Sequence, residues 1–179
     1  MRNPGELART LAERLGGTYH ALFAPAFVES VSLRDALMRE PEIQATVGLF
    51  DRVSLAIIGI GAFAGGRSSS SSLVHSRVLT DDDLSRLLGE GAVGDLILYP
   101  FDREGRFVAD QLAERAVAVT TSQLARIPRV IAVAGGTRKT EAIAGALSTG
   151  IISILVTDEA VARRLEARSH RRRGAGSTR

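Results

Sequence analysis

Apolar runs of strand length recur along the sequence and alternate with stretches of helical periodicity. Most of the runs are rich in β-branched residues and nearly continuous, which is typical of parallel strands covered on both faces. The alternation predicts an α/β fold with an open, mainly parallel sheet and helices on both faces. The predicted strands are Tyr19–Phe23, Leu55–Ile60, Leu96–Tyr99, Ala116–Val119, Val130–Ala134 and Ile151–Val156. The predicted helices are Glu6–Leu15, Leu33–Arg39, Glu42–Arg52, Asp81–Leu88, Ser122–Ile127, Arg138–Leu147 and Glu159–Ala167.

The length of 179 residues and the 45% hydrophobic content fit one globular domain, which we expect over residues 1–167. Residues 168–179 contain five arginines and no acid, and we interpret them as a basic disordered tail. Without this tail the net charge of +3 becomes mildly negative. A weakly acidic body with 4% aromatic residues lacks the surface that nucleic-acid binding requires.

Several classes of site and location are disfavoured by composition. The chain has no cysteine and only three histidines, which are far apart in sequence, so we expect no disulfide, no metal site and no catalytic thiol. No apolar stretch is long enough to span a bilayer, and the N-terminus does not resemble a signal peptide. The sequence therefore predicts a cytoplasmic protein without a cofactor.

Ligands of open parallel sheets bind where strands run into the following loops. The segment Gly59-Ile60-Gly61 directly follows a predicted strand, and its glycines would let main-chain N–H groups approach a ligand. A tight turn explains the same pattern. The five-serine run Ser68–Ser72 nearby indicates a mobile surface loop.

A second loop combines Gly135, Gly136 and Thr137 with Arg138 and Lys139 before a predicted helix. Cations at a helix N-terminus are disfavoured by the helix dipole unless an anion binds there, so this loop is a candidate anion site. Lys139 is also the only lysine of the chain. Chance and solvent exposure are the alternative explanation.

Acidic residues mark two further loops. Asp158 and Glu159 follow the last predicted strand, where they either favour the start of a helix or accept hydrogen bonds from a sugar. Asp95 and Asp102 flank the strand predicted at Leu96–Tyr99, and turn formation competes there with polyol recognition. Asp102–Gly105 is predicted to form a tight turn.

Four motifs follow one another along the chain: Gly91-Ala92-Val93-Gly94-Asp95, then Phe101-Asp102 with Gly105, then Ile127–Gly136 with Lys139, and finally Leu155–Glu159 with Ala162. In this order they resemble the C-terminal sugar-binding domain of SorC/DeoR-type bacterial transcriptional regulators. The resemblance covers roughly residues 5–167 and implies a fold akin to ribose-phosphate isomerase and glucosamine-phosphate deaminase.

The resemblance implies a sensor of phosphorylated sugars, with no catalytic residues, whose effector shifts a homo-oligomer, a dimer or a tetramer, and thereby its affinity for DNA. It also implies an N-terminal helix-turn-helix and a first phosphate-binding loop, which this sequence lacks, so DNA would be bound only through a separate domain. The implied effector-binding residues are Gly59, Gly61, Asp102, Gly135, Gly136 and Lys139, with Asp158 and Glu159 near them.

Two other functions stay open at this point. One is a sugar-phosphate isomerase or deaminase with Asp95 or Asp102 as the base and Lys139 on the phosphate. The other is a dimerisation module that binds no ligand.

Overall fold

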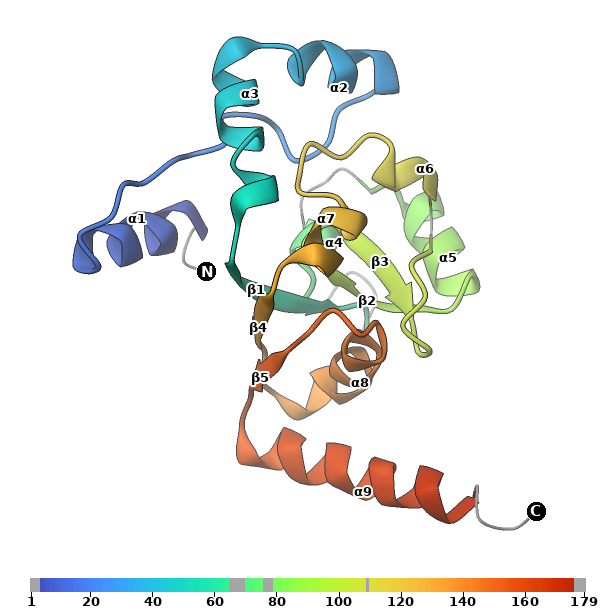
Figure 1. Ribbon diagram of the computed structural model, residues 1–179. Helices are drawn as coiled ribbons and strands as arrows, with labels where there is room; N and C mark the ends of the chain where they lie inside the picture. Colours follow the sequence, from blue (N-terminus) through green and yellow to red (C-terminus); the bar gives the residue numbers. More distant parts are fainter. Residues whose placement is uncertain (1–3, 65–69, 76–78, 109, 176–179) are drawn as a thin grey trace.

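A computed structural model of the chain describes residues 4–64, 70–75, 79–108 and 110–175. Its strands are β1 (Leu55–Ala62), β2 (Ala92–Leu96), β3 (Tyr99–Asp102), β4 (Arg129–Val133) and β5 (Ile154–Val156). They form an open sheet in the order β3–β2–β1–β4–β5 (Figure 1). β1, β4 and β5 pair in parallel, while β2 pairs antiparallel with both β1 and β3. Four strands thus share one direction and β2 opposes them, which confirms the predicted α/β fold with an open, mainly parallel sheet.

Helices precede, connect and follow these strands. They are α1 (Pro4–Arg14), α2 (Val31–Leu37), α3 (Pro41–Val47), η1 (Phe50–Arg52), α4 (Ser72–His75), α5 (Asp81–Gly89), α6 (Asp110–Ala113), α7 (Thr121–Arg126), η3 (Thr137–Lys139), α8 (Thr140–Ser148) and α9 (Glu159–Ala175). The starts of α5 and α7 have a local cause, because Thr80 and Thr120 each accept a hydrogen bond from the main-chain N–H three residues on. No helix among the described residues is long and apolar enough to cross a membrane.

The apolar core lies mainly around α8 and around α5. One cluster joins Leu96 and Ala132 of the sheet to Ile143 of α8 and Val161 of α9. A second cluster, on the opposite side of the β2–β3 end, joins Tyr99 and Ala92 to Leu87 of α5. A third, smaller cluster places α7 against β1 and β4. Helices therefore cover both faces of the sheet only at its β2–β3 end.

One face of the parallel strands is exposed. Its side chains lie in rows across the sheet, because Ile57 of β1 pairs with Ile131 of β4, and Ile131 pairs with Ile154 of β5. The large apolar side chains of this face have exposed fractions of 47–55% in Leu55, Ile57, Val133, Ile154 and Val156. We call these five residues the open sheet face. From the continuous apolar pattern of these strands, the sequence predicted that helices cover this face as well. The described helices do not cover it.

Three predicted strands are not found where the sequence placed them. Residues 19–23 form no strand, and Phe23 is 82% exposed, since no neighbouring strand pairs with this segment. The segment predicted over Ala116–Val119 contributes only an isolated bridge between Ala116 and Phe27. The segment predicted as a strand at Leu96–Tyr99 instead spans the β2–β3 hairpin. Leu96 ends β2 and pairs with Tyr99 at the start of β3, and the two residues between them form the turn, in which Ile97 adopts a positive φ of 61°.

The C-terminal helix is longer than predicted. α9 continues to Ala175, so it includes residues 168–175 of the segment for which the sequence predicted a disordered tail. Residues 176–179 lie outside the described part of the chain, as do residues 65–69, which include the first two serines of the run Ser68–Ser72.

Candidate functional site

The parallel strands bring three loops to one edge of the sheet. The loops follow β1 at Phe63, β4 at Ala134 and β5 at Thr157, all at the carboxyl ends of their strands. This is the edge at which open α/β sheets bind ligands. The sequence-predicted glycines and Lys139 lie in or beside these loops.

Lys139 ends the short helix η3, one residue before α8 begins. Its ammonium Nζ donates a hydrogen bond of 2.8 Å to the main-chain oxygen of Ile60 in β1. Burial lowers the pKa of this amine, although the attraction of the Asp95 carboxylate opposes the shift. The single lysine is therefore a partly desolvated cation fixed against the end of β1.

Asp95 is the most deeply buried carboxylate in the described part of the chain, with 3% of its surface exposed. It lies in β2 directly opposite Gly61 of β1, and its Oδ1 accepts a hydrogen bond of 2.5 Å from the Ser71 hydroxyl. Burial raises the pKa of Asp95 to about 6, against the opposing effects of the Ser71 hydrogen bond and the Lys139 charge. A Cβ on Gly61 would overlap this carboxylate, so Gly61 is required for close packing.

The sequence did not predict the hydrogen bond between Asp95 and Ser71. It placed Asp95 in a turn beside a strand and interpreted the serine run as a surface loop, whereas the structure buries both Asp95 and Ser71. The antiparallel pairing of β2 with β1 is a long-range contact, and no local pattern around Asp95 predicts it.

Gly135, Gly136 and Asp158 form a second group at the same edge. The Gly136 N–H donates to Asp158 Oδ2 at 2.6 Å, and the Val161 N–H donates to Asp158 Oδ1 at 3.0 Å. These bonds lower the pKa of Asp158, with the Gly136 bond the largest cause. Asp158 thus caps α9 and holds the loop after β4, which is one of the two roles that the sequence left open for it.

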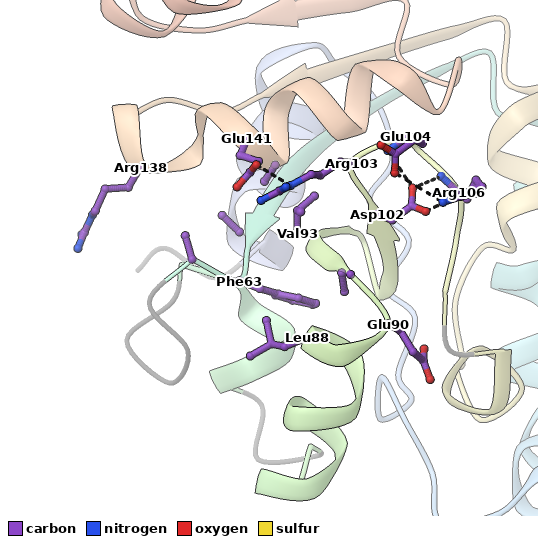
Figure 2. Close-up of a pocket in the computed structure, with 15 residues that line it drawn as sticks. Phe63, Leu88, Glu90, Val93, Asp102, Arg103, Glu104, Arg106, Arg138 and Glu141 are labelled. Carbon is purple, nitrogen blue, oxygen red and sulfur yellow. Dashed lines mark hydrogen bonds and ion pairs between the residues drawn. The ribbon is translucent and has the colours of Figure 1, made fainter.

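Asp102 lies apart from that group, in a turn beside a cavity of about 700 Å³ (Figure 2). It accepts hydrogen bonds from the main-chain N–H groups of Glu104 and Arg106, both at 2.9 Å, and from Arg106 Nε at 2.7 Å. Burial alone would raise the pKa of Asp102. The hydrogen bonds and the Arg106 charge nevertheless hold it below its ordinary value. The predicted tight turn at Asp102–Gly105 is confirmed, since the Gly105 N–H donates a hydrogen bond of 3.1 Å to the main-chain oxygen of Asp102.

The cavity has a charged rim and an apolar floor. Arg103 Nε and Glu141 Oε1 form an ion pair of 2.7 Å across it, and Arg138 extends from its other side (Figure 2). Phe63 and Leu88 lie below. Arg138 has no ion-pair partner among the described residues, so its charge is available to a ligand.

The predicted site residues therefore separate into distinct places. Gly61 and Lys139 meet around Ile60, and Gly135, Gly136 and Asp158 meet at the start of α9. Gly59 is exposed on the face of β1, where a Cβ would meet no atom. Glu159 contacts neither group; its Oε1 pairs with Arg163 on the surface of α9. No cluster of three or more metal-ligating side chains occurs within the described ranges.

The buried hydroxyl of Thr157 adds an unsatisfied group to this edge. Its Oγ1 has no hydrogen-bond partner among the residues that the structure describes. A buried hydroxyl of this kind is normally satisfied by water or a ligand.

Comparison with known proteins gives the context of this site. The Sugar-bind family model, described as a sugar-binding domain, matches residues 1–165. The erythritol catabolism regulatory protein EryD of Brucella abortus is 26% identical over 91% of this chain and 50% of its own length. The transcriptional regulator LsrR of Klebsiella pneumoniae is 31% identical over 78% of this chain and 43% of its own length.

A solved sugar-binding domain of a transcriptional repressor from Vibrio fischeri superposes with a TM-score of 0.81 at 30% identity. The match covers 94% of this chain and 66% of that one. The chain spans about half the length of the curated relatives that it matches. It belongs to the sugar-binding domain family of SorC/DeoR-type bacterial transcriptional regulators.

Proposed function

We propose that this domain is a non-enzymatic, cytoplasmic sensor that binds a phosphorylated sugar at the carboxyl edge of its sheet. The phosphate lies at the start of α8, near Arg138 and Lys139, and the sugar hydroxyls face the carboxylates that line the neighbouring cavity. The observation on which the proposal depends is the placement of two adjacent cations at this helix start. Lys139 is partly buried, and Arg138 has no ion-pair partner within the described ranges.

The electrostatics at this position favour an anion. No side chain caps the start of α8, and the two residues before its first turn are Arg138 and Lys139. Their charges oppose the positive end of the helix dipole, and a bound phosphate would relieve that repulsion. Desolvation of Lys139 adds to the effect, because a cation with fewer waters gains more from a bound anion.

The cavity fits the second half of such a ligand. Its volume of about 700 Å³ is within the range of small-molecule sites, and its rim provides carboxylate acceptors for hydroxyl groups in Asp102 and Glu141. The predicted effector residues Gly59, Gly135, Asp158 and Glu159 would act less directly. They position the loops or lie outside the cavity.

Binding would be coupled to a change in the homo-oligomer and, through a separate helix-turn-helix domain, to the affinity for DNA. The names of the relatives, which are regulators, support the regulatory role of the domain, and the change in the homo-oligomer is part of our proposal.

A thermal-shift screen with phosphorylated sugars and their unphosphorylated counterparts tests the binding site. A ligand at 100 times its Kd adds about 2.7 kcal/mol to the free energy of unfolding. We expect a shift with at least one phosphorylated sugar, loss of that shift in Arg138→Ala and Lys139→Ala, and no loss in the control Arg126→Ala, whose exposed guanidinium pairs with Asp51. No response to any compound would contradict the proposal, and a response unchanged in both variants would place the phosphate elsewhere.

A sugar-phosphate isomerase or deaminase is the second candidate. The observation in its favour is Asp95, a buried carboxyl whose pKa of about 6 suits a general base and which lies near Lys139. Turnover of a sugar phosphate that disappears in Asp95→Asn, while binding persists, would favour the enzyme over the sensor.

A further inference from the structure

A buried carboxylate acts on the lysine of the candidate anion site. Lys139 Nζ donates a hydrogen bond of 2.8 Å to the Ile60 oxygen, which leaves two of its three N–H groups for other partners. The negative charge of Asp95 attracts this ammonium and favours its protonated form. Because Asp95 is only 3% exposed, the solvent screens this attraction little. Asp95 is therefore an internal counter-ion of Lys139.

The Asp95 carboxylate is fixed in position by its neighbours. Gly61 lies against it so closely that a Cβ there would overlap the carboxylate. The Ser71 hydroxyl accepts hydrogen bonds from the N–H groups of Leu73 and Val74, at 3.1 and 3.3 Å. It therefore directs its own hydrogen to Oδ1 of Asp95. Both Leu73 and Val74 are buried in the apolar cluster of α5, so the hydroxyl is held in place and the carboxylate has little room to move.

Lys139 is the charged group that acts on Asp95. Gly61 of β1 and Pro100 of β3 lie opposite Asp95 in the sheet, and neither of them titrates. The buried residues of α5 and α8, which pack on the sheet, carry no charge either. The protonation of Asp95 consequently depends on its burial, on the Ser71 hydroxyl and on the lysine. An anion that neutralises the ammonium changes the third of these influences.

We propose that an anion bound at Lys139 replaces Asp95 as the counter-ion of this lysine, and that Asp95 takes up one proton from the solvent as the anion binds. The inference rests on the proposed function, because it requires a phosphate at the start of α8. Two negative charges at one poorly solvated site repel each other, and protonation of the carboxylate removes the repulsion. The proton lies on Oδ2, so that Oδ1 keeps its hydrogen bond from Ser71.

The affinity for the anion then depends on pH. Asp95 has a pKa of about 6 while Lys139 attracts it, and this pKa rises when the anion cancels the attraction. Protonation of Asp95 and binding of the anion therefore favour each other. The affinity increases as the pH falls toward 6 and levels off below that value. Each unit by which the pKa rises corresponds to a factor of ten, so we expect about tenfold tighter binding at pH 5 than at pH 8.

Calorimetric titration of the chain with sulfate tests the coupling. Sulfate is a dianion that does not itself titrate near neutral pH, and chloride keeps the ionic strength constant. Titrations in two buffers of different ionisation enthalpy count the protons taken up. We expect an uptake that is largest between pH 6 and pH 7 and disappears by pH 8. An uptake that instead grows toward pH 9 would belong to the amine of Lys139, whose pKa is also lowered, and would overturn the proposal.

Two further outcomes separate this inference from the proposed function. Sulfate that binds without any proton uptake overturns the coupling and leaves the phosphate site intact. A chain that binds no sulfate at all contradicts both, since the phosphate position at the start of α8 is then wrong.

Asp95→Asn removes the group that takes up the proton. At pH 7.5 this variant should bind sulfate about ten times more tightly than the parent chain, and as tightly as the parent does at pH 5. The matched control is Asp51→Asn, which changes an exposed carboxylate paired with Arg126 and should keep the pH dependence of the parent. Weaker binding by Asp95→Asn at both pH values would show that the carboxylate supports the anion site instead of competing with the anion.

Ser71→Ala keeps the test decisive if Asp95→Asn fails to fold by circular dichroism. The hydrogen bond from Ser71 lowers the pKa of Asp95, so its removal should move the midpoint of the pH dependence of sulfate affinity to higher pH. An unchanged midpoint would show that Asp95 is not the group that titrates.

Discussion

The Lys139 ammonium donates a hydrogen bond to the main-chain oxygen of Ile60 at 2.8 Å and thereby joins the start of α8 to the end of β1. One bond thus connects the two loops that the sequence singled out separately, Gly59–Gly61 and Gly135–Lys139. The same lysine is held where burial disfavours its charge.

The chemical reactivity of Lys139 follows from that position. Because burial lowers the pKa of its amine, more of the amine is unprotonated near pH 8 than in an ordinary lysine. As the only lysine, it shares amine labelling with the chain terminus alone. Reductive methylation followed by mass spectrometry over a pH series should give a midpoint below that of a lysine model peptide. A midpoint at or above the peptide value would show that burial does not control the protonation of Lys139.

The buried carboxyl of Asp95 should make stability depend on pH. Its folded-state pKa of about 6 lies above the ordinary value of 3.8, so the folded state binds this proton more tightly than the unfolded state. The tighter binding of this proton adds about 3 kcal/mol to the free energy of unfolding. The contribution is fully present below pH 3.8 and is lost as the pH rises through 6.

Urea unfolding between pH 4 and pH 7 measures this dependence. Asp95→Asn keeps an oxygen that accepts from Ser71 and has no proton to lose, so its free energy of unfolding should fall less over that range than that of the parent chain. Asp51→Asn, which changes an exposed carboxylate, should keep the slope of the parent. Equal slopes in all three proteins would show that Asp95 does not titrate in this range.

The two glycines of β1 should differ sharply in their tolerance of a methyl group. A Cβ at position 61 would overlap the Asp95 carboxylate, whereas a Cβ at position 59 would meet no atom. Gly61→Ala should lower the free energy of unfolding by about 1–3 kcal/mol, because the buried carboxylate must shift. Gly59→Ala should be neutral or stabilising by about 0.5–1 kcal/mol. Similar losses in both variants, measured by chemical denaturation, would contradict the packing of Asp95 on Gly61.

The sequence predicted the elements whose patterns are local. β1, β4 and β5 are continuous apolar runs, and α5 and α8 begin and end within two residues of their predicted limits. The segment at residues 19–23 is also mostly apolar but remains outside the sheet. A strand needs a neighbour, and local composition cannot supply one.

The candidate site was predictable only in part for the same reason. Lys139 was conspicuous as a lone lysine, yet its contact with Ile60 joins residues far apart in the sequence. The hydrogen bond between Asp95 and Ser71 was missed because it depends on how β2 lies against β1. The sequence placed Asp158 in the loop after the last predicted strand with two possible roles, and the structure shows the contact of the first of them, the cap of α9.

The two adjacent acids at the start of α9, Asp158 and Glu159, should differ in how much they stabilise the fold. Asp158 accepts hydrogen bonds from the N–H groups of Gly136 and Val161, whereas Glu159 makes only a surface ion pair with Arg163. Asp158→Ala should lower the Tm, since it removes the cap of α9 and the tie to the loop after β4 at once, and Glu159→Ala should leave the Tm nearly unchanged. The pKa of Asp158 is lowered in the folded state, so the stability that it adds is present above the ordinary carboxyl pKa and is lost as the pH falls through the folded-state value. The Tm difference between Asp158→Ala and the parent, followed by scanning calorimetry, should therefore shrink in acid, and a difference independent of pH would show that the charge of Asp158 does not hold this loop.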